Sequence, residues 1–83
     1  MLGGNHVLKK EDAKKFGAHL GNKIQTIRKT ENLSIEELSE QSGLSVTRIR
    51  KWENGSGARL PVVELAQLAK ALKTSLDYFL DDY

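Results

Sequence analysis

Two helix-start signals placed eleven residues apart constrain this chain more than any other feature of its sequence. They lie in the stretch SIEELSEQSGLSVTRIRKWENG, residues 34–55. Ser34 with Glu37 three residues later is a capping-box pattern, in which both side chains accept hydrogen bonds from backbone N–H groups at the helix start. Ser45 marks a second start, and Gly43 between them tolerates the positive φ of a sharp turn. The spacing predicts two short helices joined by a tight turn.

The second of these helices has two chemically different faces. At about 100° per residue, Ile49 and Trp52 fall on one side, where we expect them to face a core. The opposite side is basic and polar, and its residues are Thr47, Arg50, Lys51 and Asn54. An exposed helix with such a face fits the major groove of DNA, which is wide enough to admit an α-helix.

Apolar residues at helical spacing predict three further helices. The first contains Phe16, Leu20, Ile24 and Ile27, the second Val62, Leu65, Leu68, Ala69 and Leu72, and the third Leu76, Phe79 and Leu80. Gly17 and Gly21 weaken the first helix by about 1 kcal/mol each, and we expect a neighbouring helix or a phosphate to approach closely there. The prediction is an all-α fold of five helices in a domain of residues 16–83. Residues 1–15 are predicted to be a flexible basic arm, with an extra helical turn as the alternative for residues 9–15.

The composition excludes several classes of protein and site. The chain has no cysteine, hence no disulfide framework and no thiolate chemistry. It has no apolar run of membrane-spanning length and no signal-peptide core, so we expect a cytoplasmic protein without a membrane partner. His6 and His19 lack partners at metal-ligand spacing, and no Ser–His–acid order or supported carboxylate pair indicates catalysis. We therefore expect no metal, no cofactor, no small-molecule ligand and no enzymatic activity.

The charge is unevenly distributed along the chain. Residues 1–33 contain seven Lys or Arg against three Asp or Glu, whereas residues 61–83 contain two against four. This asymmetry suits a protein that presents one end to a polyanion. The alternative is a solvated surface whose asymmetry is accidental.

The stretch 34–55 resembles the helix-turn-helix of Cro/C1-type repressors, the XRE-like regulators, and the similarity extends over roughly residues 20–80. The matching positions are Ile24, Ile27, Arg28, Leu38, Ser39, Gly43, Leu44, Ile49, the run Trp52-Glu53-Asn54-Gly55, Leu68, Ala69, Ala71 and Leu72. The resemblance implies a compact lambda-repressor-like bundle that binds double-stranded DNA. Ile35 departs from the family, which often places a glutamine there to reach a phosphate, because isoleucine has no hydrogen-bond donor.

The resemblance also implies roles for individual residues. The positions that read bases in the family are held here by Val46, Thr47, Arg50 and Lys51. Phosphate contacts are expected from Ser34, Ser45, Arg48, Asn54 and Arg59, since such contacts set register without specifying sequence. Arg28 and Glu53 are expected to form an ion pair between the first helix and the end of the third, and a phosphate contact by Arg28 is the alternative. For the reading face, the alternative is a set of merely solvent-facing side chains.

The expected function is sequence-specific DNA binding by a small transcriptional regulator, most simply a repressor acting as a homodimer on a pseudo-palindromic operator. We expect the dimer contact to use Tyr78, Phe79, Leu80 and Tyr83, because so small a core has little room for them. The alternative is that these side chains pack internally or lie singly exposed. An antitoxin or a restriction-modification controller would use the same domain. A coactivator-like protein-interaction module without DNA contact is the alternative that Ile35 and the acidic helix of residues 34–42 support.

Overall fold

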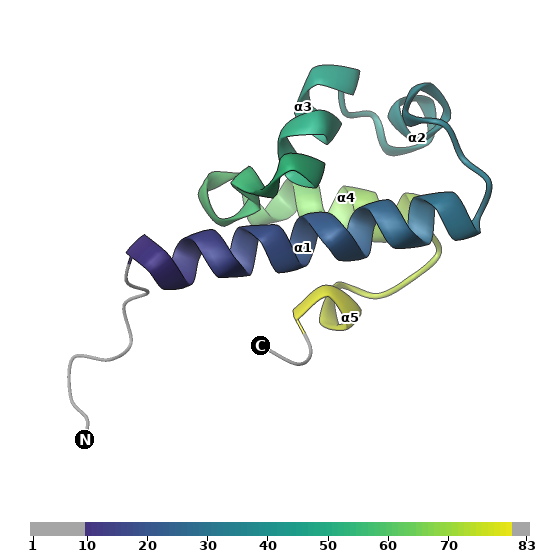
Figure 1. Cartoon of the computed structure of the whole chain (residues 1–83). Helices are drawn as coiled ribbons and strands as arrows, with labels where there is room; N and C mark the ends of the chain where they lie inside the picture. Colours follow the sequence, from purple (N-terminus) through teal and green to yellow (C-terminus); the bar gives the residue numbers. More distant parts are fainter. Residues whose placement is uncertain (1–9, 81–83) are drawn as a thin grey trace.

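The computed structural model describes residues 10–80, which form five α-helices and two short helical turns. These are α1 (Lys10–Thr30), α2 (Ile35–Ser42), α3 (Val46–Lys51), η1 (Trp52–Ser56), η2 (Gly57–Arg59), α4 (Val62–Ala71) and α5 (Leu76–Leu80). Figure 1 shows α1 running along the molecule, with α2 and α3 on one side of it and α5 on the other. No helix within residues 10–80 is long and apolar enough to cross a membrane. The predicted all-α fold with five helices is confirmed.

The first helix begins earlier than the sequence pattern predicted. We expected the folded domain to start at residue 16, whereas α1 begins at Lys10. Residues 10–15 read KEDAKK, without glycine or proline, and lysine, glutamate and alanine have high helix propensities. The extra-turn alternative therefore holds for residues 10–15. Residues 1–9 lie outside the described residues, and a flexible arm there stays a prediction.

The core lies between α1 and the other helices. Its largest fully buried side chains are Leu20, Ile24, Leu38, Ile49, Trp52, Leu65, Leu68 and Phe79, and all five α-helices pack on them. The burial of Phe79 corrects our assignment of this residue to a dimer contact. The helix α5 packs on both α1 and α4, and the ring of Phe79 lies on the side of α5 that faces the core. Phe79 is therefore unavailable to a partner.

The predicted caps of the helix-turn-helix are present. Ser34 Oγ accepts from the Glu37 N–H at 3.0 Å, and Glu37 Oε1 accepts from the Ser34 N–H at 2.9 Å, which completes the capping box. Ser45 Oγ accepts from the Arg48 N–H at 3.1 Å at the start of α3. Gly43 ends α2 with φ 81°, the left-handed conformation predicted for the turn. The local sequence thus determines both helix starts and the reversal between them.

The helix α1 packs against η1 with backbone on backbone. A Cβ atom at Gly17 would overlap the carbonyl oxygen of Gly55. One at Gly21 would lie 2.6 Å from the Glu53 carbonyl oxygen and 2.7 Å from that of Trp52. The close neighbour that these glycines require is therefore the protein's own backbone. This contact sets the position at which the chain leaves α3.

Lys73 ends α4 in a conformation that favours glycine. Its φ is 58°, and the Thr74 N–H donates to the Ala69 carbonyl oxygen at 2.9 Å, as in a Schellman motif. Asn32 has a φ of 59° just beyond α1, but asparagine tolerates the left-handed region. For lysine the cost is roughly 1–2 kcal/mol. The end of α4 is therefore a strained position.

We expect Lys73→Gly to raise the free energy of unfolding by about 0.5–1 kcal/mol, because removing the Cβ relieves this strain but makes the unfolded chain more flexible. Urea denaturation measures the change. Lys70→Gly is the control, since Lys70 lies in the right-handed last turn of α4 and its replacement should lower stability by about 1 kcal/mol. A lower free energy of unfolding in Lys73→Gly would contradict the claim that the backbone at Lys73 is strained.

We expect Gly21→Ala to lower the free energy of unfolding by about 1–3 kcal/mol, because the new Cβ forces α1 and η1 apart. Its exposed neighbour on α1 provides a matched control, and Asn22→Ala should be neutral or slightly stabilising through helix propensity. Thermal and urea denaturation of the three proteins would show the difference. Equal stabilities of the two variants would mean that the backbone contact is unimportant.

Candidate nucleic-acid interface

The helix α3 has one buried and one exposed face, as predicted. Ile49 is 0% exposed and Trp52, which comes directly after the helix, is 1% exposed. The polar residues on the other side, Thr47, Arg50 and Lys51, are all exposed, and Val46 in the first turn is half-buried. The predicted reading residues therefore share one outward surface, which we call the α3 face. Their contact with DNA stays a prediction.

An ion pair joins α1 to the end of this helix. Arg28 Nε donates to Glu53 Oε2 at 2.7 Å and Nη2 donates to Oε1 at 3.2 Å, while Nη1 donates to the Leu33 carbonyl oxygen at 2.8 Å. The two charged side chains are only 11% and 6% exposed. Arg28 thus forms the ion pair that the resemblance implied, and its donors point into the protein, which argues against the phosphate alternative. Removing one partner would strand a buried charge, at a cost of about 3–5 kcal/mol.

A second pair involves Arg48, which we expected to contact a phosphate. Its Nε donates to Glu64 Oε2 at 2.9 Å, and Glu64 Oε1 accepts from Trp52 Nε1 at 3.0 Å. One carboxylate on α4 therefore holds two residues of the α3 region. Because the Nε–H group is already donated, a phosphate contact by Arg48 would have to use its Nη groups. No pattern in the sequence singles out Glu64, since its partners are 12 and 16 residues away.

The remaining phosphate candidates lie at the starts of α2 and α3 and beyond the end of α3. Ser34 and Ser45 use their hydroxyl oxygens as acceptors in the helix caps, which leaves each O–H able to donate to a phosphate. Asn54 and Arg59 are exposed beyond the end of α3. All four assignments stay predictions.

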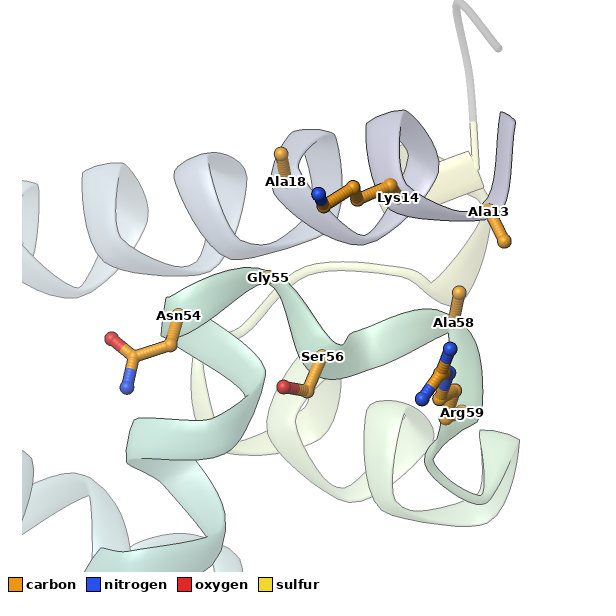
Figure 2. Close-up of a pocket in the computed structure, with 8 residues that line it drawn as sticks. All are labelled: Ala13, Lys14, Ala18, Asn54, Gly55, Ser56, Ala58 and Arg59. Atoms are coloured by element: carbon orange, nitrogen blue, oxygen red, sulfur yellow. The ribbon is translucent and has the colours of Figure 1, made fainter. Parts of the chain in front are cut away.

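A pocket of about 570 Å³ lies between the first turns of α1 and the segment 54–59. Figure 2 shows its lining residues, which are Ala13, Lys14, Ala18, Asn54, Gly55, Ser56, Ala58 and Arg59. Two predicted phosphate contacts, Asn54 and Arg59, thus share a concave surface. Lys14 joins them from α1, although the sequence indicated only a charged run there. Its place at the pocket depends on how α1 crosses the segment 54–59, for which there is no local sequence signal.

The predicted dimer residues are divided by the structure. Tyr78 and Leu80 are each 40% exposed, Phe79 is buried in the core, and Tyr83 lies outside the described residues. Lys23 Nζ donates to the Tyr78 carbonyl oxygen at 2.6 Å and lies 4.5 Å from the centre of its ring. This contact holds α5 against α1 and orients the exposed side of Tyr78.

Two other apolar side chains are more exposed than those of α5. Val62 and Val63, in the first turn of α4, are 61% and 63% exposed. The sequence pattern placed Val62 in the core stripe of this helix, whereas the structure leaves it at the surface. The buried apolar stripe of α4 begins at Leu65, which is 2% exposed.

Ile35 has a structural role at its position in α2. The side chain is half-buried and packs against the core cluster. The departure from the family pattern is therefore compensated by apolar contact with the body of the protein. A direct phosphate contact by this side chain remains excluded by its chemistry.

Comparison with known proteins matches this chain to a helix-turn-helix family model and to proteins named transcriptional regulators. A family model described as Helix-turn-helix matches residues 24–79. The uncharacterized HTH-type transcriptional regulator y4wC of Sinorhizobium fredii is 32% identical over 82 residues, which cover 99% of this chain and 57% of that protein. An uncharacterized transcriptional regulator in ATPase CF(0) region of Rhodospirillum rubrum is 35% identical over 65 residues, 78% of this chain and 59% of that protein.

The matched relatives are longer than this chain. It spans 57% and 59% of the lengths of these two regulators. No solved structure shows significant similarity to it. The family match nevertheless covers well over half of the chain and includes the capped turn, the α3 face and the ion pair between Arg28 and Glu53. The chain therefore belongs to the Cro/C1-type helix-turn-helix family.

Proposed function

We propose that this protein binds double-stranded DNA in a sequence-specific manner as a transcriptional regulator. The observation that carries the proposal is the α3 face, on which Thr47, Arg50 and Lys51 are exposed while Ile49 and Trp52 hold the helix to the core. Membership of the helix-turn-helix family and similarity to proteins named transcriptional regulators support it.

The chemistry of the α3 face suits the edges of bases in the major groove. Arg50 and Lys51 can donate to guanine O6 and N7, whereas the methyl groups of Val46 and Thr47 can contact a thymine methyl group. Phosphate contacts by Ser34, Ser45, Asn54 and Arg59 would set the register of the helix in the groove. Arg48 would contribute through its Nη groups, since its Nε–H is bound to Glu64.

We further propose that the protein acts as a repressor and as a homodimer on a pseudo-palindromic operator. One domain of this size contacts few base pairs. Two copies related by symmetry would therefore bind more tightly than one and would recognise a longer site. Their half-sites would lie one helical turn apart, about 34–36 Å. Tyr78 and Leu80 on α5 are the described residues that we assign to the dimer contact.

Other functions of the same domain remain open to test. An antitoxin or a restriction-modification controller would bind DNA through the same α3 face. A protein-interaction module without DNA contact rests on Ile35 and on the acidic helix α2, and packing on the core accounts for the first of these. Salt-dependent binding of genomic fragments would separate the DNA-binding functions from this module.

We expect Lys51→Ala to weaken binding to the preferred duplex by about 1–3 kcal/mol and to relax the base preference at one position, because a base contact is lost. Fluorescence anisotropy measures both effects, with duplexes selected from a random pool. Lys70→Ala is the matched control, since Lys70 is an exposed lysine on α4. Equal losses on selected and random duplexes would show that Lys51 does not read a base.

We expect Leu80→Ser to weaken the dimer at micromolar concentration, because it removes an exposed apolar side chain from α5. Analytical ultracentrifugation of the variant against the parent protein measures the change in mass. Val63→Ser is the control, since Val63 is exposed and apolar but lies on α4. A dimer weakened by the second variant alone would move the interface to α4.

A further inference from the structure

The pocket between α1 and the segment 54–59 has two walls that are held together by backbone contact. One wall is α1, which contributes Ala13, Lys14 and Ala18, and the other is the segment itself. The two approach so closely that a Cβ at Gly17 would overlap the Gly55 carbonyl oxygen. The relative position of the two walls is therefore set by backbone packing.

The described lining of this pocket carries positive charge. Lys14 and Arg59 lie on opposite walls in Figure 2, and both are exposed. Among the side chains that the structure describes, no carboxylate lines the pocket, and neither cation forms an ion pair with any of them. By contrast, Arg28 and Arg48 are each paired with a glutamate. The pocket thus combines two available cations with the polar groups of Asn54 and Ser56.

One wall of the pocket begins at Asn54, three residues after the end of α3. Residues 52–54 keep helical dihedral angles after α3, and Asn54 comes seven residues, about two turns, after Thr47. Asn54 therefore lies on the same side as the predicted base-reading residues and also lines the pocket. The major groove is about 12 Å wide and is bordered by phosphates on both strands. A duplex held on the α3 face would bring one of those strands to the pocket.

We propose that this pocket binds a phosphate group of the DNA backbone at the edge of the groove, with Lys14 and Arg59 as its two cations. The inference rests on the proposed function, and its new element is Lys14 on the first turns of α1. The volume of about 570 Å³ leaves room for the sugars next to the phosphate. The contact fixes register and adds affinity on every sequence, because phosphates carry no sequence information.

The test compares two adjacent lysines of α1. Lys14 and Lys15 are both exposed, but only Lys14 lines the pocket. In Lys14→Gln, the slope of log K against log salt should become shallower by about 0.9, and affinity should fall equally on selected and random duplexes. Lys15→Gln should keep the slope of the parent protein. Urea denaturation of both variants checks that folding is unchanged.

A second measurement locates the phosphate on the duplex. Ethylation of single phosphates should interfere with binding of the parent protein at a position bordering the half-site. The same ethylation should interfere less with binding of Lys14→Gln, because one of the two cations that hold the phosphate is already lost. Interference of equal size in both proteins would overturn the assignment of Lys14.

Failure of the inference can be told from failure of the proposed function. If the parent protein binds duplexes and Lys51→Ala weakens binding, but Lys14→Gln behaves as Lys15→Gln, the pocket is not a phosphate site. If the parent protein shows no salt-dependent binding to any duplex, the proposed function itself is wrong. A further experiment titrates the parent protein with inorganic phosphate alone and follows the NMR chemical shifts. Shifts at Lys14 there, with an unchanged salt slope on DNA, would mean that the pocket takes free phosphate instead.

Discussion

The contact between the glycine face of α1 and the backbone of η1 is the constraint on which the rest of the structure depends. Gly17 and Gly21 let two backbones meet where any side chain would separate them. This places Trp52 in the core, and a Cβ at Gly57 would lie 2.8 Å from its ring. The helix α3 has only six residues and is too short to be stable alone. The orientation of α3 therefore comes from the segment that follows it. The α3 face points outward because Trp52 is buried in the core and η1 packs against α1.

Two carboxylates divide the cations of this protein into two groups. Glu53 binds Arg28 and Glu64 binds Arg48, so these arginines hold helices together. The exposed cations Lys14, Arg50, Lys51 and Arg59 have no such partners among the described residues. Because a paired charge contributes little field at a distance, the group without carboxylate partners dominates the potential that a polyanion meets. Both paired arginines thus contribute to the presentation of the interface, although neither lies freely on it.

Much of the local structure could be predicted from short patterns. The capping box at Ser34, the cap at Ser45 and the turn at Gly43 involve groups within five residues of one another, so the sequence contains all the partners. The predictions that failed depend on distant contacts. Phe79 is buried because α5 packs against both α1 and α4. The apolar residues of α5 had suggested a dimer contact, because the sequence does not show that this packing makes room for the ring. The start of α1 at Lys10 is a different case, because residues 10–15 carry charged side chains and little apolar pattern, and the sequence left a flexible arm and an extra helical turn as alternatives.

The sequence by itself determined where α2 and α3 begin, which face of α3 is polar, and that the helices form an all-α bundle, since caps and periodicity act over one or two turns. The family resemblance implied that Glu53 neutralises Arg28, but only the tertiary structure decided that Glu64 neutralises Arg48 and that Lys14 and Arg59 remain available. Arg28 meets Glu53 across 25 residues of chain and Arg48 meets Glu64 across 16, so both pairs depend on the crossing of helices. The pocket that joins Lys14 to Arg59 has the same origin, because its two walls meet only after α1 has packed on η1.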